Sequence, residues 1–267
     1  MIPYPFRYRR AKSLTDAETL LSDLPDAKLL AGGQSLIAAM KLRLSQPSDL
    51  IDISGLNELS VIRVERDGIA VGAGATHHHV ANAPEVIRAI PALSMLAENI
   101  GDPAVRHAGT IGGAVANNDP AADYPAALLA LGATVRTNRR AIMADDFFTG
   151  MFSTALQDGE IIKEISFAVP ERAAYRKFRN PASRYAMVGV FVAKTTSGVQ
   201  VAVTGAASCV FRAGGMEAAL ADDFSPGAVT KIRIDPDDLN SDIHASAEYR
   251  AHLVTVMAGR AVAEALA

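Results

Sequence analysis

The chain has 267 residues, of which 49% are hydrophobic and 21% charged, as in an average soluble globular protein. Its formal net charge is −3, and both signs are spread along the chain, which argues against a basic nucleic-acid-binding surface. No apolar stretch approaches the ~18 residues that a membrane span needs, and no apolar signal segment follows the cationic N-terminus. We therefore expect a cytoplasmic protein without a membrane span.

The chain contains one cysteine, Cys209. A single thiol excludes a disulfide framework and a four-cysteine zinc or iron–sulfur site. Because Cys209 lies in the apolar stretch 201–211, which is typical of a strand, we predict a small buried side chain rather than a catalytic thiol.

The first 170 residues alternate between strand and helix patterns, which favours an α/β architecture. A helix should begin near Ser13 or Thr15, because each has an acidic residue three positions later, in the spacing of a capping box. Asp67-Gly68 predicts a hairpin between strands at 61–65 and 69–72. Further strands are predicted at 28–31, 50–53, 134–137, 141–143 and 161–169, and helices at 34–44, 126–131 and, as two short pieces, 85–99. The glycine-rich segment 101–125 is too long to be only a connector.

The pattern changes after Pro170, where we place a domain boundary. Apolar alternation predicts an antiparallel meander, and two helices are predicted beside it. The strands are expected at 175–179, 187–195, 199–211 and 230–234, and the helices at 214–221 and 248–267.

Two glycine loops are the main candidates for a binding site. The first is Ala31-Gly32-Gly33-Gln34-Ser35-Leu36, at a strand-to-helix junction where unpaired N–H groups can meet an anion. The second, Gly109-Thr110-Ile111-Gly112-Gly113-Ala114, is also rich in backbone donors and small side chains. Together they could hold a pyrophosphate from two sides. Neither has the spacing of a Rossmann fingerprint or a phosphate-binding P-loop, and a single Gly-Gly pair is commonly an ordinary turn.

Several motifs occur together over nearly the whole chain. They are Ala31–Leu36 followed by Met40-Lys41-Leu42-Arg43, the run 100–106 leading into Thr110–Gly113, Asp119-Pro-Ala-Ala-Asp123, and Ala247-Glu-Tyr-Arg250. In this combination the chain resembles the flavin-binding medium subunits of molybdenum hydroxylases. These comprise the carbon monoxide dehydrogenase medium subunit and the flavin domain of xanthine dehydrogenase.

The resemblance implies an FAD-binding fold of the vanillyl-alcohol-oxidase class. Residues 1–170 would form two small α/β lobes, about 1–55 and 56–170, and residues 171–267 a C-terminal α+β domain with an antiparallel sheet. FAD would lie between these regions. The resemblance assigns its pyrophosphate to the two glycine loops, that is, to Ala31, Gly32, Gly33, Gln34, Ser35 and Leu36 and to Thr110, Ile111, Gly112, Gly113 and Ala114.

Four further side chains are assigned by the resemblance alone. Asp123 would bond the adenosine part or a nearby loop, Ile162 and Lys177 would contact flavin, and Tyr185 would cover the isoalloxazine. The alternatives are a core isoleucine, a solvated lysine and an ordinary loop tyrosine. The chain departs from its relatives at Gln34, His107 and Ala114, where histidine, asparagine and asparagine are common.

Other polar clusters have simpler interpretations. The tract His77-His78-His79 resembles a metal site, but consecutive residues do not share a helix face, so we predict no metal. His107 is expected to be a solvated loop residue rather than a catalytic one, and Asp119 to form an Asx-turn. The basic run Arg7, Arg9, Arg10 and Lys12 would be a solvated face or meet an acidic partner.

The function implied by the resemblance is electron relay. FAD in this chain would receive electrons from the iron–sulfur clusters of a small partner subunit and pass them to NAD, a quinone or oxygen. A large partner subunit would carry molybdenum, and the assembly would often be a dimer of heterotrimers. No catalytic side chain is assigned. The alternatives are a self-contained flavin reductase of the same fold, for which we find no proton donor or substrate-anion pocket, and a non-enzymatic nucleotide-binding assembly subunit.

Overall fold

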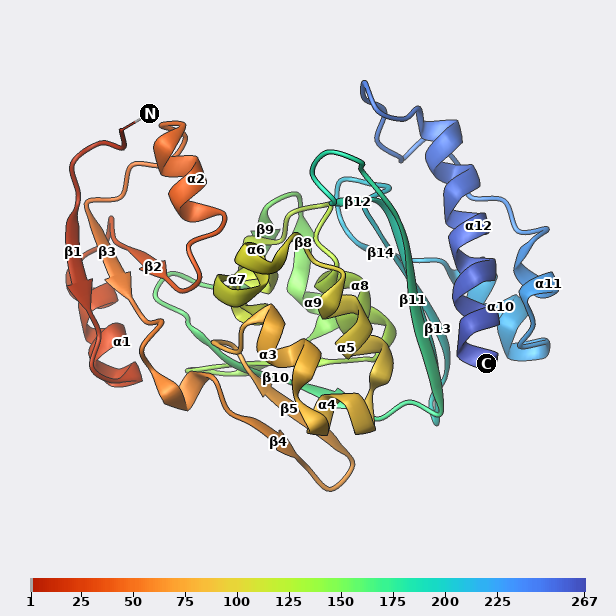
Figure 1. Cartoon of the computed structure of the whole chain (residues 1–267), viewed down its shortest axis with the longest axis horizontal. Coiled ribbons are helices and arrows are strands. Elements are labelled where there is room, and N and C mark those ends of the chain that lie inside the picture. Colours follow the sequence, from red (N-terminus) through yellow and green to blue (C-terminus); the bar gives the residue numbers. More distant parts are fainter. Residues whose placement is uncertain (1) are drawn as a thin grey trace.

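The computed structural model describes residues 2–267, and three sheets follow one another along the chain (Figure 1). The first sheet has the order β1-β3-β2 with both pairs parallel. Its first helix begins at Ser13, whose Oγ accepts the Asp16 N–H at 3.1 Å, so Ser13 rather than Thr15 is the N-cap. The elements are β1 (Arg7–Arg10), α1 (Leu14–Asp23), β2 (Lys28–Leu30), α2 (Leu36–Lys41) and β3 (Asp49–Asp52).

The second sheet has the order β4-β5-β10-β6-β7, and its neighbouring strands are antiparallel. The hairpin expected at Asp67-Gly68 joins its first two strands. The strands are β4 (Ile62–Val64), β5 (Gly68–Gly72), β6 (Thr134–Thr137), β7 (Ala141–Met143) and β10 (Ile162–Ala168), and a small separate pair is β8 (Phe148–Gly150) and β9 (Ser153–Thr154). The helical elements around it are η1 (Asn57–Leu59), α3 (His77–Asn82), α4 (Pro84–Ala89), α5 (Pro91–Glu98), α6 (Pro103–Ala108), α7 (Ile111–Asn117), α8 (Tyr124–Ala130) and α9 (Ala144–Phe147).

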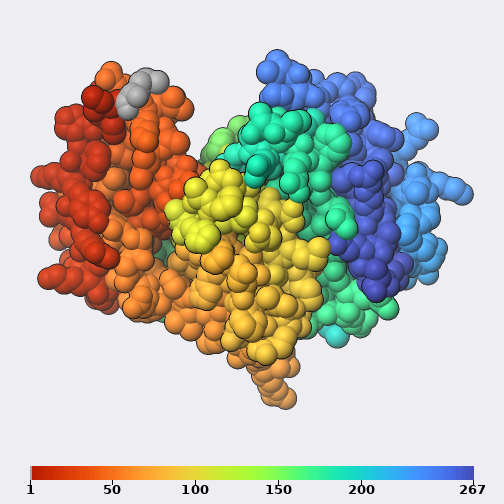
Figure 2. Space-filling view, viewed as in Figure 1, coloured from red at the N-terminus to blue at the C-terminus, as the bar shows by residue number. Residues whose placement is uncertain are grey.

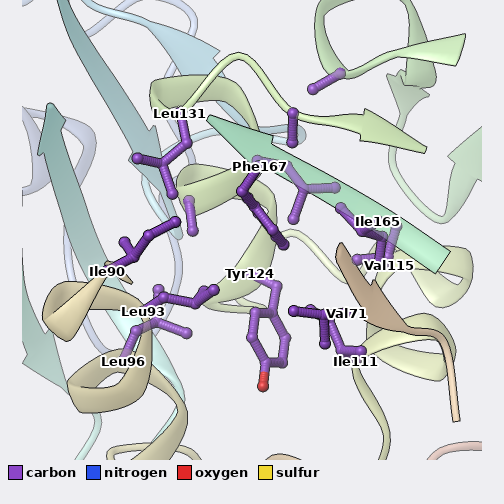
Figure 3. Packing of buried hydrophobic residues seen from close by; sticks show 14 of the residues in the cluster. Val71, Ile90, Leu93, Leu96, Ile111, Val115, Tyr124, Leu131, Ile165 and Phe167 are labelled. Atoms are coloured by element: carbon purple, nitrogen blue, oxygen red, sulfur yellow. The ribbon is translucent and has the colours of Figure 1, made fainter. Parts of the chain in front are cut away.

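The central core fills the space between this sheet and its helices (Figure 3). Tyr124, Phe167 and Leu93 are fully buried in it. The glycine-rich segment 101–125 contributes two short helices to this region, α6 and α7, which the sequence pattern did not predict. Their N-caps are Asp102 and Thr110, whose side chains accept backbone N–H groups.

The third sheet is antiparallel, in the order β11-β12-β13-β14, and it packs on both faces. Along β12, Val188, Val190 and Val192 belong to the core under α12, whereas Phe191 and Ala193 join the central core. The elements are β11 (Arg172–Arg179), β12 (Ala186–Thr195), β13 (Gly198–Thr204), β14 (Phe211–Arg212), α10 (Gly214–Asp222), α11 (Pro226–Val229) and α12 (Ala247–Leu266).

Of two strand predictions in this region, one was too long and the other was wrong. The strand expected over 199–211 ends at Thr204, because Gly205 adopts a left-handed conformation (φ +81°) and turns the chain. Cys209 therefore lies outside any strand, half-buried against the central core. The segment Thr230–Ile234 is not a strand either: its apolar residues Ile232 and Ile234 pack against the α12 core without a strand partner.

In the described part of the chain, no helix is both long and apolar enough to cross a bilayer.

Candidate functional site

The first glycine loop leaves β2 and enters α2, and it presents backbone donors. Gly33 has φ +69°, which allows the tight turn. The N–H groups of Gly32 through Ser35 find no acceptor among residues 2–267, and the Ser35 side chain makes no capping bond. Only the Gln34 amide reaches back, to Gly32 O at 3.5 Å. This chemistry fits an anionic group, since a row of unpaired N–H groups is what a phosphate requires.

The second glycine loop differs from the expectation of free donors. The N–H groups of Ile111 and Gly112 donate to carbonyls of Ala75 and Ala73 at 3.0 and 2.8 Å. Gly113 N–H donates to Thr110 Oγ1 at 3.1 Å, and Ala114 N–H to Thr110 O at 3.0 Å. These four amides are therefore already hydrogen-bonded within the chain, two to Thr110 and two to residues outside the loop.

The three small residues of the second loop also have separate roles. A Cβ on Gly112 would lie 2.5 Å from the Ala73 Cβ, so this glycine permits close packing of α7. Gly113 is exposed, and a Cβ there would meet only Thr110 Oγ1, at 2.9 Å. Gly113 and half-buried Ala114 therefore leave open surface on this helix end.

The structure brings the two loops into contact. A Cβ on Gly32 would lie 2.7 Å from both the Ala108 carbonyl carbon and Gly109 Cα, and closer still to the Ala108 oxygen. Glycine is thus required where the first lobe meets the segment before Thr110. Figure 2 shows the surface hollowed between the red-orange N-terminal part and the teal part of the third sheet, with yellow residues near its floor. The loops therefore meet at the hollow.

A buried ion pair joins the residue that precedes α8 to strand β11. The Asp123 carboxylate accepts Tyr175 Oη at 2.5 Å and Lys177 Nζ at 2.9 Å. The Lys177 side chain is only 3% exposed, so the alternative of a solvated lysine is wrong. Burial raises the pKa of Asp123, although Lys177 and Tyr175 favour its anion. Tyr175 was missed by the sequence analysis; its signal was the spacing of two from Lys177, which puts both on one face of β11.

Ile162 and Tyr185 lie in different surroundings. Ile162, the first residue of β10, is 6% exposed and belongs to the central core. Tyr185 is 47% exposed and closes a tight turn in which Asn180 N–H donates to Tyr185 O at 2.8 Å. Burial, followed by the charges of Asp119 and Asp123, raises the pKa of Tyr185.

Two of the three consecutive histidines lie in different surroundings. His77 is buried with its ring 5.4 Å from that of Tyr124, and burial, with a smaller effect of Arg106, lowers its pKa to about 4. His78 instead stacks on His107 at 4.0 Å between ring centroids. Within residues 2–267, no three His, Cys, Asp or Glu side chains gather as metal ligands. His107 lies on α6 rather than in a loop, and it is exposed.

Asp119 and the basic run near the N-terminus also form hydrogen bonds and ion pairs within the chain. Asp119 Oδ1 accepts the Ala121 N–H at 2.9 Å, which confirms the Asx-turn. In the basic run, Arg7 and Arg9 pair with the buried Asp49 side chain at 3.0 and 2.8 Å. Their hydrogen bonds hold the pKa of Asp49 down to about 2, so one negative charge within the chain already offsets part of the charge of this run.

The structure combines a parallel sheet, antiparallel sheets and two glycine loops in contact, and the first loop carries unpaired backbone donors that fit an anionic group. The family model described as the FAD binding domain in molybdopterin dehydrogenase matches residues 4–171. The chain belongs to this family of FAD-binding medium subunits of molybdopterin dehydrogenases, as the sequence motifs indicated.

The similarity extends over the full length of several relatives. The chain is 36% identical to the carbon monoxide dehydrogenase medium chain of Hydrogenophaga pseudoflava, covering 100% of this chain and 97% of that one. It is 34% identical to the glyceraldehyde dehydrogenase medium chain of Sulfolobus acidocaldarius, with 99% of each covered. A solved carbon monoxide dehydrogenase from Hydrogenophaga pseudoflava matches with a TM-score of 0.90 and 34% identity, covering 100% of this chain and 99% of that one. The chain is thus an oxidoreductase subunit of this family.

Proposed function

We propose that this chain holds FAD non-covalently and serves as the electron-transfer subunit of a cytoplasmic molybdenum hydroxylase complex. The observation that carries the proposal is the contact between the two glycine loops, in a member of an FAD-binding family. Bound FAD supplies the redox chemistry, because its isoalloxazine can exchange electrons both singly and in pairs. The finer fold assignment, the vanillyl-alcohol-oxidase class with FAD between the lobes, is part of the same proposal.

The two glycine loops would contribute differently to binding the pyrophosphate. The amides of Gly32, Gly33, Gln34 and Ser35 are unpaired and would donate to its oxygens, aided by the Ser35 hydroxyl. Thr110–Ala114 would form the opposite wall. In that wall Gly113 and Ala114 face the ligand, while buried Ile111 and Gly112 fix the helix end. Ala31 and Leu36 would hold the first loop between its strand and its helix.

The remaining assigned residues would act on the flavin part. Tyr185, half exposed on its turn, would cover the isoalloxazine. Lys177 would present its buried ammonium near the ring with Asp123 as its counter-ion, and Ile162 would pack beneath. None of these groups is asked to abstract or deliver a proton.

The chain needs partner subunits for this role. Its single cysteine cannot hold an iron–sulfur cluster, so the electrons must come from another polypeptide. We propose an iron–sulfur small subunit and a molybdenum large subunit, assembled as a dimer of heterotrimers, with NAD, a quinone or oxygen as the acceptor. Docking of standard size would bury roughly 1,600 Å² in total.

Isolation of the native complex through this chain tests the proposal. We expect FAD, iron and molybdenum to co-purify with three polypeptides. The isolated chain should bind FAD without hydroxylating any organic substrate. Recovery of this polypeptide alone, with full substrate turnover and neither metal, would overturn the electron-transfer role and favour a self-contained reductase.

A further inference from the structure

Arg250, on α12, is a buried arginine that connects two strand ends. It is 4% exposed, and its Nη1 donates to Met187 O at 2.7 Å and to Gly205 O at 3.0 Å. Its Nη2 donates to Asp242 Oδ2 at 2.7 Å. The guanidinium therefore joins the beginning of β12 to the residue that follows β13.

These two carbonyls lie where the ladder between β12 and β13 stops. The last paired residues at this end are Gly189 and Thr204. Beyond them Gly205 takes its left-handed conformation, and a Cβ there would collide with the Ala186 carbonyl oxygen. The Nη1 group of Arg250 supplies donors to both carbonyls at a point where the strands no longer supply them to each other.

The strand ends held by Arg250 in turn hold the candidate flavin site. Gly205 N–H donates to Pro120 O at 2.8 Å, and Thr204 Oγ1 donates to Ala122 O at 2.6 Å. Pro120 and Ala122 belong to the loop that ends at Asp123. On the other side, Met187 comes two residues after Tyr185. One guanidinium therefore supports both the Asp123 loop and the Tyr185 turn.

We propose that Arg250 is a positioning residue for the flavin site, acting through the ends of β12 and β13 on Asp123 and Tyr185. Stability alone explains it poorly, because a buried charge is costly and the Arg250 Nε–H is buried without an acceptor in the described chain. The inference rests on the proposed FAD binding, but the geometry of the Asp123 loop and of the Tyr185 turn can be measured without the cofactor.

The test compares Arg250→Met and Arg250→Lys with two control variants of the same helix. Methionine keeps much of the volume and removes every donor, whereas lysine keeps the charge but has a single nitrogen and cannot also replace the Nη2 bond to Asp242. Leu253→Ala removes an apolar side chain that is 4% exposed in the α12 core and leaves the donors of Arg250 in place, so it reports a loss of stability alone. Arg260→Met removes an exposed arginine.

The full-length variants are titrated with FAD, and their flavin absorption and fluorescence are recorded. Arg250→Met should weaken FAD binding roughly tenfold, which corresponds to about 1.4 kcal/mol, and alter both spectra. Arg250→Lys should recover part of the loss. Leu253→Ala should lower Tm while the flavin properties of the folded protein stay unchanged, and Arg260→Met should change neither.

Amide hydrogen exchange in the absence of FAD gives the second readout. Exchange should increase at 119–123 and 184–187 in Arg250→Met but not in Leu253→Ala. Wild-type flavin binding together with wild-type exchange in Arg250→Met would overturn the inference, as would equal local changes in Leu253→Ala. If Arg250→Met does not fold, Arg250→Lys is judged by the same comparison. If the wild type binds no FAD, the proposed function fails, and the exchange data still decide the positioning role.

Discussion

Replacing Gly32 by alanine should disturb the site at the contact between its two loops. The new Cβ would stand 2.7 Å from two backbone atoms of Ala108 and Gly109, whereas ordinary contact begins at 3.4 Å. The loops must therefore separate by about 0.7 Å or more, and backbone on both sides cannot rotate away. A shift of this size would lengthen one charge-assisted hydrogen bond to the pyrophosphate beyond useful range. That loss is worth about 2 kcal/mol, or roughly thirtyfold in Kd.

The assay is a titration of FAD into flavin-free protein, followed by quenching of flavin fluorescence. Gly214→Ala serves as the matched control, because a Cβ there meets no atom of the described chain within 4 Å. The control should bind FAD like the wild type. A Gly32→Ala protein with the Kd and the Tm of the wild type would show that the two glycine loops do not touch as described. It would refute the FAD site proposed at their contact.

Four other variants test separate parts of the account. Gly113→Val, whose Cβ would meet only the Thr110 hydroxyl, should weaken FAD binding at least tenfold; an unchanged Kd would remove Gly113 from the site. Tyr185→Ala should alter flavin fluorescence and sulfite bleaching while FAD content stays near normal, and unaltered spectra would return Tyr185 to a structural role. Lys177→Met should lower the free energy of unfolding by about 3 kcal/mol or more, measured in urea, because Asp123 would stay buried without its counter-ion; Lys194→Met, at a half-exposed lysine, is the control. Because the pKa of His77 is lowered from 6.5 to about 4, the unfolded chain takes up the proton first. Stability should therefore be complete above pH 6.5 and fall by up to about 3 kcal/mol as the pH drops to 4. His77→Gln should flatten that profile, and an equally steep decline in the variant would contradict the assignment.

Local signals in the sequence predicted much of the fold. The cap at Ser13 and the hairpin at Asp67-Gly68 depend only on neighbouring residues, and both were found. The segment Thr230–Ile234 has the alternation of a strand, but the same alternation serves to pack two isoleucines against α12. Pairing requires a partner strand, and no local pattern supplies that information.

The site was predictable to a similar extent. The glycine pairs and the family motifs located both loops, but spacing cannot tell which amides are already bonded. In the second loop the donors are used by Ala73 and Ala75, residues more than thirty positions away. The burial of Lys177 likewise depends on its partner Asp123, 54 residues earlier. Long-range contacts decide such features, and a single sequence does not reveal them.

The central claim, that this chain holds FAD non-covalently in the hollow between its lobes, is tested most directly by the flavin content of the purified protein. After incubation with FAD and removal of the excess, we expect a flavin spectrum at one FAD per chain. Acid precipitation should then release all of the FAD into the supernatant. Protein that stays colourless after incubation, or flavin that remains in the precipitate, would contradict the claim.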